Sequence, residues 1–171
     1  MTRSRSVTSL AGAAAISLTA LALAACGGGT GGGTATVGVS TTGVGKVLVD
    51  SKGHTLYLFE KDSGTKSACA GACALNWPPL RASGAPTAAG GAKASLVATT
   101  KRSDGTSQVT YNGHPVYRYQ GDMKPGDTAG QGVTAYGAEW YALGPAGKQV
   151  TEKSSASDGD STSGYGGGSG Y

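Results

Sequence analysis

One ten-residue stretch occurs twice in the chain, as GHTLYLFEKD at residues 53–62 and as GHPVYRYQGD at residues 113–122. Gly, His, Tyr and Asp recur at the same places, sixty positions apart, and Phe59 in the first copy corresponds to Tyr119 in the second. The recurrence indicates a structural unit that is used twice. One copy has too few strands to be stable alone, so we expect the two copies to share one compact core.

The likeness extends beyond these ten residues. In each copy a turn precedes the Gly-His pair, and a long connection leads from the Asp to a Trp that is followed three residues later by a Leu. These residues are Trp77 and Leu80 in the first copy and Trp140 and Leu143 in the second. We therefore expect the first repeat at about residues 44–80 and the second at about residues 107–143.

Short β-rich runs and turn signals dominate the middle of the chain, where helical periodicity is weak. Hairpin turns are predicted at Ser51-Lys52-Gly53, at Ser103-Asp104-Gly105 and at Asn112-Gly113, and residues 144–147 join the last pair of strands. Pro115 cannot donate a ladder hydrogen bond, so it should begin its strand or lie at a sheet edge. The predicted strands are residues 46–50, 55–60, 96–102, 107–111, 115–119, 138–143 and 148–150. This pattern predicts an all-β fold that is mainly antiparallel.

One short helix is expected within that fold. The segment SACAGACALNW at residues 67–77 is rich in Ala, and Pro78-Pro79, which follows it, cannot continue a helix. Two long loops are expected at residues 87–93 and 121–132. The second loop is Gly-rich and polar and should lie at the surface.

The N-terminus has the layout of a secretory signal. Arg3 and Arg5 form a basic region, and residues 7–25 form an uncharged, mostly apolar run. The run ends in Leu23-Ala24-Ala25-Cys26, which resembles a bacterial lipobox, the signal in which the chain is cut before the Cys and the thiol receives a diacylglycerol. We predict that the lipid on Cys26 anchors the protein to the extracytoplasmic face of a bacterial cell membrane. The alternative is an uncleaved membrane helix, because the apolar run is nearly long enough to span a bilayer.

Composition divides the remainder of the chain into three parts. Residues 26–36 form a Gly-rich tether behind the lipidated Cys, and the Ser- and Gly-rich residues 151–171 have too little apolar surface to fold. Between them, residues 37–150 are expected to form one domain. Removal of residues 1–25 lowers the net charge from +4 to +2 because Arg3 and Arg5 are lost. So small a charge gives no indication of nucleic-acid binding.

The chain has three Cys, an odd number for an exported protein. If Cys26 carries lipid, Cys69 and Cys73 remain as a pair in an oxidising compartment. Four residues of helix bring two Cα atoms to roughly 6 Å, which is within disulfide range. We predict a structural disulfide. The alternative is a thiol pair that binds Cu(I) or exchanges electrons, because soft thiolates select copper.

The aromatic residues of the repeated stretch alternate along their strands. Tyr57 and Phe59 therefore share one strand face, and Tyr117 and Tyr119 share another. We expect these four rings to pack in the core, because aromatic side chains dominate core burial. A groove that stacks a ligand is the alternative.

Two further pairs of residues recur between the copies. Asp62 and Asp122 end their strands where a turn begins, and an Asp in that position commonly bonds the nearby backbone. Ion binding is the alternative role. His54 and His114 are expected to make structural hydrogen bonds, with a shared metal site as the alternative.

Both copies match the pattern Tyr-x-(Phe/Trp/Tyr)-x-x-Asp. The chain therefore resembles the bacterial predicted lipoproteins defined by this motif, also called the secreted repeat of unknown function. Residues 69–74 and 77–80 are also similar to the connection between repeats in that family. The resemblance covers roughly residues 44–143, and it implies an exported address and a two-repeat architecture. It implies no reaction.

These observations favour a lipid-anchored protein of the cell envelope whose β domain serves binding or structure. Its expected partners are the membrane, through the lipid, and a cell-envelope protein or polymer. The chain lacks Gly-x-Ser-x-Gly, His-Glu-x-x-His and a phosphate loop, so we expect neither catalysis nor a cofactor. The alternative is an extracytoplasmic copper-handling or redox protein. Its candidate ligands are Cys69, Cys73, His54, His114 and Met123.

Overall fold

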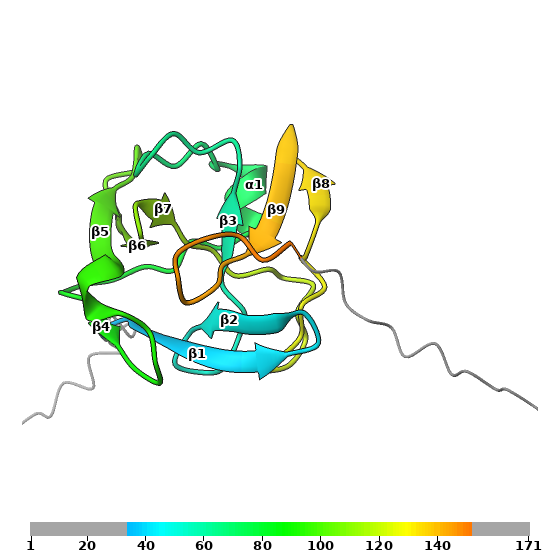
Figure 1. Ribbon diagram of the computed structural model, residues 1–171. Helices are drawn as coiled ribbons and strands as arrows, with labels where there is room; N and C mark the ends of the chain where they lie inside the picture. The colour runs from blue at the N-terminus through cyan, green and yellow to red at the C-terminus, as the bar shows by residue number, and fades with distance from the viewer. Residues whose placement is uncertain (1–33, 152–171) are drawn as a thin grey trace, which may run out of the picture. The chain divides into compact units, whose positions relative to one another are not determined.

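The structure is a computed structural model that describes residues 34–151. Three small sheets have the strand orders β2-β1-β4, β3-β9-β8 and β5-β6-β7 (Figure 1). Among the strand pairs of these sheets, only β1 and β4 run parallel. The predicted all-β, mainly antiparallel fold with one short helix is confirmed. In chain order the elements are β1 (Thr36–Thr42), β2 (Gly45–Val49), β3 (Tyr57–Phe59), α1 (Ala72–Asn76), β4 (Thr87–Ala88), the 3-10 helix η1 (Ala94–Leu96), β5 (Val97–Lys101), β6 (Ser107–Tyr111), β7 (His114–Pro115), β8 (Val133–Ala135) and β9 (Ala138–Ala142).

Several predictions made from the sequence concern residues outside this range. The signal segment with Cys26, the Gly-rich residues before Thr34, and the tail from residue 152 onward lie outside the described residues. Within residues 34–151, no helix has the length and apolar character needed to cross a membrane.

Each repeat begins with an antiparallel hairpin. In the first half β1 pairs with β2, and in the second half β5 pairs with β6, as the turn at residues 103–105 predicted. The predicted pairing of residues 46–50 with 55–60 is confirmed only in part. The two segments meet antiparallel at the bridge between Val49 and Thr55, whereas β2 pairs along its length with β1. The carboxylate of Asp50 stabilises this turn, because its Oδ1 accepts hydrogen bonds from the backbone N–H groups of residues 52 and 54.

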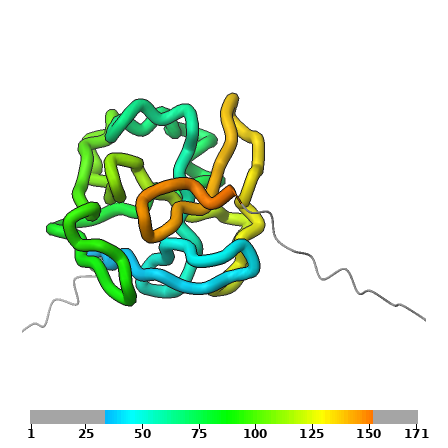
Figure 2. Tube along the Cα trace, in the orientation of Figure 1, coloured from blue at the N-terminus to red at the C-terminus, as the bar shows by residue number. Residues whose placement is uncertain are grey.

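The two repeats exchange strands and so share a core. β3 of the first repeat pairs with β9 of the second, and Figure 2 shows their traces side by side although they are far apart in sequence. Tyr57 and Tyr117 also exchange backbone hydrogen bonds of 2.8 and 3.0 Å. Side chains from both repeats make up each of the two buried apolar clusters. The expectation of two related repeats around one compact core is therefore confirmed.

The remaining elements differ from the predictions in extent. The helix covers only Ala72–Asn76, because Gly71 has a positive φ of 57° and the backbone N–H groups of residues 68 and 69 bond to side chains instead of continuing a helix. Residues 87–93 were predicted as a loop, but Thr87–Ala88 forms β4 beside β1. β8 lies just beyond the predicted loop 121–132 and was missed. Pro115 lies on the edge strand β7, as predicted.

Candidate functional site

A column of four stacked aromatic rings lies at the junction of the two repeats. The two Trp rings stack on each other, with their centroids 3.9 Å apart and their planes 6° apart. Each Trp then stacks on a motif residue of the other repeat, Trp140 on Phe59 at 4.0 Å and Trp77 on Tyr119 at 4.2 Å. We call Phe59, Trp140, Trp77 and Tyr119 the aromatic column. Tyr57 and Tyr117 meet the Trp rings edge-on, at 5.4 and 5.2 Å.

The Tyr and Asp of the motif are exchanged between the two copies. The hydroxyl of Tyr57 donates to Oδ2 of Asp122 at 2.7 Å, and that of Tyr117 donates to Oδ2 of Asp62 at 2.8 Å. Each carboxylate also accepts a backbone N–H from the connection that follows it, of Ala68 at Asp62 and of residue 129 at Asp122. Sequence reasoning missed this exchange. The only signal for it is that the motif occurs twice with the same spacing.

Burial sets the protonation of these pairs. Burial raises the pKa of Tyr57 and of Tyr117, and the facing carboxylate raises each pKa further. Burial also raises the pKa of Asp62 and of Asp122, although the hydrogen bonds that they accept act in the opposite direction. The two phenols therefore keep their protons and act as fixed donors. Because both carboxylates already serve as acceptors, ion binding by Asp62 and Asp122 is not favoured.

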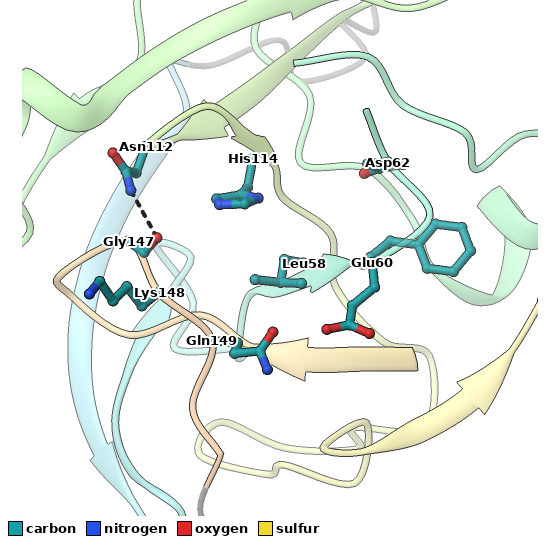
Figure 3. Close-up of a pocket in the computed structure, with 9 residues that line it drawn as sticks. Leu58, Glu60, Asp62, Asn112, His114, Gly147, Lys148 and Gln149 are labelled. Carbon is teal, nitrogen blue, oxygen red and sulfur yellow. Dashed lines mark hydrogen bonds between the residues drawn. The ribbon is translucent and has the colours of Figure 1, made fainter. Parts of the chain in front are cut away.

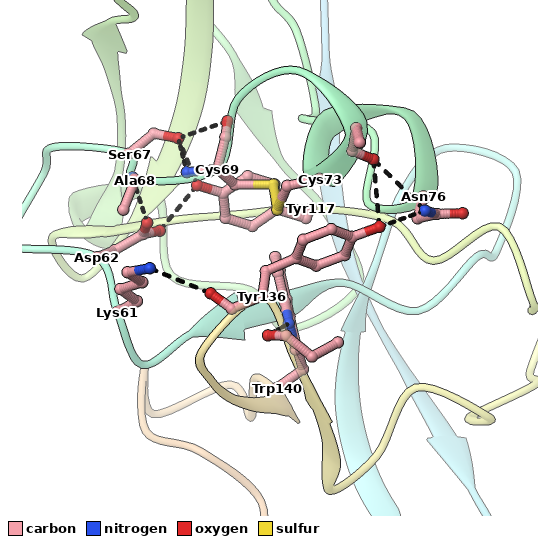
Figure 4. Close-up of a disulfide and its surroundings, with 12 residues drawn as sticks. Lys61, Asp62, Ser67, Ala68, Cys69, Cys73, Asn76, Tyr117, Tyr136 and Trp140 are labelled. Atoms are coloured by element: carbon pink, nitrogen blue, oxygen red, sulfur yellow. Dashed lines mark hydrogen bonds between the residues drawn. A yellow bond between two sulfur atoms is a disulfide. The ribbon is translucent and has the colours of Figure 1, made fainter.

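The predicted disulfide between Cys69 and Cys73 is confirmed, with an S–S distance of 1.98 Å and a Cα–Cα distance of 5.3 Å (Figure 4). It lies beside Tyr117 and Trp140, and both Cys are buried. Arg102, which sequence reasoning did not identify, donates from its guanidinium to the Cys69 carbonyl and to the side chain of Gln108. The disulfide is thus part of the framework that delivers Trp77 to the column.

The copper or redox alternative is not favoured by this arrangement. Both sulfurs of the Cys pair are bonded to each other, so the thiolates that would select copper are not present. Met123 is 84% exposed, and the two His lie in different hollows of the surface. Within residues 34–151, no group of three or more His, Cys, Asp or Glu is placed to hold a metal ion.

Two hollows lie beside the motif strands. Phe59 lines the larger, the open hollow, and Tyr119 lines the smaller, the narrow hollow, with volumes of about 600 and 240 Å³. Other residues that line the open hollow are Leu58, Glu60, Asp62, His114, Lys148 and Gln149 (Figure 3). Other residues that line the narrow hollow are His54, Pro78, Arg118, Gln120 and Asp122. Each hollow therefore combines the His of one repeat with the motif strand of the other.

The two His residues have different surroundings. Nδ1 of His54 lies 3.4 Å from Oδ2 of Asp50, and Nη1 of Arg118 lies 3.6 Å from the same oxygen. The ring of His114 instead points into the open hollow, where its charge when protonated would act on Asp62 (Figure 3). Alignment of the two copies makes Glu60 equivalent to Gln120 and Leu58 equivalent to Arg118. This alignment of the two copies is the sequence signal for these hollow-lining residues.

Comparison with known proteins agrees with this two-repeat geometry. A family model described as a secreted repeat of unknown function matches residues 38–81 and 98–143, which together make up more than half of the chain. Each match begins in the first hairpin of a repeat and ends at, or one residue after, the Leu that follows the Trp. No curated protein and no solved structure matches the chain. Two matched repeats, interleaved around one aromatic column, show that the chain belongs to the family of secreted repeats of unknown function.

Proposed function

We propose that the protein is lipid-anchored on the extracytoplasmic face of a bacterial cell membrane and that its β domain binds or supports a partner without catalysis. The anchor in this proposal is Cys26, at the end of the Leu-Ala-Ala-Cys stretch. The Gly-rich residues that follow would act as a flexible tether between the membrane and the domain. Membership of a secreted family supports the extracytoplasmic address.

The observation that carries the non-catalytic role is the exchange of Tyr and Asp between the repeats. The motif's carboxylates and phenols bond to each other across the core, so these four groups are not free to exchange protons with a substrate. Asp122 is buried, and so are both phenols. The duplicated motif therefore supports a rigid platform, and the side chains around the two hollows are left as the surfaces for a partner.

Anchoring is tested with Cys26→Ser in the full chain. The wild-type protein should incorporate an alkyne-labelled palmitate and sediment with membranes, whereas the variant should take up no label and either enter the medium or accumulate as an unprocessed precursor. Cys69→Ser is the matched control, because it removes a different Cys and should leave labelling unchanged. If the Cys26 variant were shortened normally and still retained on the membrane, lipid anchoring would be refuted.

A further inference from the structure

The open hollow combines polar groups from both repeats. Leu58, from β3, lies in the middle of the view, and Glu60 follows that strand on one side (Figure 3). His114 comes from β7, and Lys148 comes from the turn that follows β9. Its volume of about 600 Å³ lies in the range of hollows that take small molecules.

Charge is divided between two sides of this hollow. Glu60 and Asp62 lie on one side, Lys148 lies on the other, and His114 points in between them (Figure 3). Asp62 already accepts bonds from Tyr117 and Ala68, so it supplies charge, whereas Glu60 supplies an unused acceptor. Carboxylates on one side and an ammonium on the other complement a ligand that carries both signs of charge.

Four of the polar side chains that line the hollow, those of Glu60, Lys148, His114 and Gln149, are available to a ligand. None of the four makes a hydrogen bond or an ion pair with another residue in the range 34–151. Together they offer an acceptor, a charged donor, an imidazole and an amide.

The turn that carries Lys148 is fixed in place. Nδ2 of Asn112 donates to the carbonyl of Gly147 at 3.0 Å (Figure 3). Gly147 has a positive φ of 73°, and a Cβ there would meet the Asn112 side chain at 2.3 Å. The backbone at Lys148 is thereby held beside the hollow, so less ordering is needed when a ligand binds.

The narrow hollow is an internal comparison. It is built from equivalent parts of the other repeat, but Arg118 takes the place of Leu58 and ion-pairs with Asp50. Gln120 takes the place of Glu60, which removes one carboxylate. The volume of the narrow hollow is about 240 Å³. Equivalent parts of the two repeats therefore form a larger hollow in one half of the protein and a smaller hollow with different charged residues in the other. The difference indicates that the open hollow is more than a by-product of the duplicated fold.

We propose that the open hollow binds a short zwitterionic peptide, with its ammonium end at Glu60, its carboxylate end at Lys148 and its small side chains against Leu58. This assignment rests on the proposed function, because it names the ligand class of a non-catalytic binding domain. Gln149 and His114 would bond the peptide groups between the two charged ends. The free energy of binding would come mainly from the two charge-assisted contacts.

The test titrates the full chain, in detergent micelles, with Ala, Ala-Ala and Ala-Ala-Ala. Amide resonances of residues 60, 114 and 148 should shift on addition of at least one of these, and those of the narrow hollow should not. Blocking the ends of the best binder separately, by N-acetylation and by C-terminal amidation, should each weaken binding about tenfold or more.

Two variants connect each end of the ligand to its residue. Glu60→Gln, which installs the residue found in the narrow hollow, should weaken the free peptide about tenfold and leave the acetylated peptide unaffected. Lys148→Met should bind the free-acid peptide and its C-terminal amide with equal affinity, because the ammonium group that contacts the carboxylate end is removed. Lys101→Met, at an exposed Lys of β5 outside the hollow, is the matched control and should change nothing.

Each other result overturns the proposal. Equal binding of free and blocked peptides, or loss of affinity in Lys101→Met to the same degree, would show that charge at the hollow does not select the ligand. If no peptide binds, the zwitterionic ligand class is wrong. Because anchoring is judged separately by labelling of Cys26→Ser, failure of the peptide titration leaves the proposed address in place, and failure of the labelling leaves the peptide result in place.

Discussion

The connection after Asp62 and the connection after Asp122 have the same structural role, but different interactions stabilise them. Each delivers a backbone N–H to its Asp and a Trp to the aromatic column. The first contains α1 and the disulfide, and Arg102 holds it through the carbonyl of Cys69. The second contains β8 and a Gly-rich turn in which Asp127 accepts two backbone N–H groups.

The comparison of the two connections indicates what the duplicated motif requires. The column and the Tyr–Asp pairs are nearly symmetric, whereas the segments that support them are not. The geometry of the shared core is therefore maintained by the motif residues themselves, and each connection needs only to end in the right place. Loss of a column residue should consequently cost more than loss of any support, which sets the order of the following predictions.

Replacement of a column Trp by Ala should have the largest effect. Trp77→Ala and Trp140→Ala each remove a fully buried ring and should lower the free energy of unfolding by about 3–5 kcal/mol. Trp140→Ala should be the more damaging, because its outer neighbour Phe59 is buried whereas Tyr119, beside Trp77, is partly exposed. Urea unfolding followed by circular dichroism measures both.

The corresponding Phe variants keep this comparison measurable if an Ala variant fails to fold. Trp77→Phe and Trp140→Phe retain a ring at each position, so both should lose less than the Ala variants. If Trp77 variants were consistently the more damaging, the enclosed end of the column would not be the more stabilising one.

Removal of a motif hydroxyl should have the next largest effect. Tyr57→Phe and Tyr117→Phe each delete a hydrogen bond to a carboxylate and should cost about 1.5–3 kcal/mol. Tyr117→Phe should cost more than Tyr57→Phe, because the two hydroxyls differ in the second bond that each makes. Besides its bond to Asp62, the Tyr117 hydroxyl bonds the side chain of Ser67 at 2.7 Å. Besides its bond to Asp122, the Tyr57 hydroxyl accepts only a longer bond of 3.3 Å from the backbone N–H of Gly130.

A double-mutant cycle tests whether each pair acts across the repeats. Tyr57→Phe combined with Asp122→Asn should show a coupling free energy, and Tyr57→Phe combined with Asp62→Asn should be additive. Coupling between Tyr57 and the Asp of its own copy would contradict the exchange.

Loss of the disulfide should affect only the first connection. The change of both Cys69 and Cys73 to Ser removes a very short loop closure and should lower the free energy of unfolding by about 2 kcal/mol. Signals from residues of the second connection, such as Asp127, should not move. Native protein should resist alkylation of both Cys until it is reduced, as judged by mass spectrometry. Alkylation of both Cys without reductant would contradict the disulfide and favour the copper-binding or redox alternative.

The sequence predicted the parts of this fold that are local. The β5–β6 hairpin follows from its turn at residues 103–105. The four-residue spacing of Cys69 and Cys73 predicted the disulfide, although Cys69 precedes α1 and does not lie on the helix assumed for that spacing. The pairing of β3 with β9 has no local signature, because both faces of residues 55–60 are apolar and several partners would satisfy them. The Tyr–Asp exchange was hidden for the same reason. A motif shows which residues recur, but only the relative orientation of the two copies shows which of them meet.

Acidification should give the smallest effect, and it compares the two Asp directly. Burial raises the pKa of Asp62 and of Asp122, so the folded protein binds more protons than the unfolded chain between the ordinary Asp pKa of 3.8 and the raised values. The stabilisation is complete below the ordinary pKa and is lost as pH rises through the raised pKa values, so the free energy of unfolding should increase on moving from pH 7 into that window. Asp62→Asn and Asp122→Asn should each flatten this dependence, and by similar amounts if the two pairs are equivalent.

Asp104 provides the opposite control, because hydrogen bonds from Thr106 lower its pKa and its contribution to stability is lost as pH falls. Asp104→Asn should therefore steepen the gain in the free energy of unfolding on acidification. Urea midpoints measured across the window decide the matter, and a gain that survives in the Asp62 and Asp122 variants would assign the effect to other carboxyl groups.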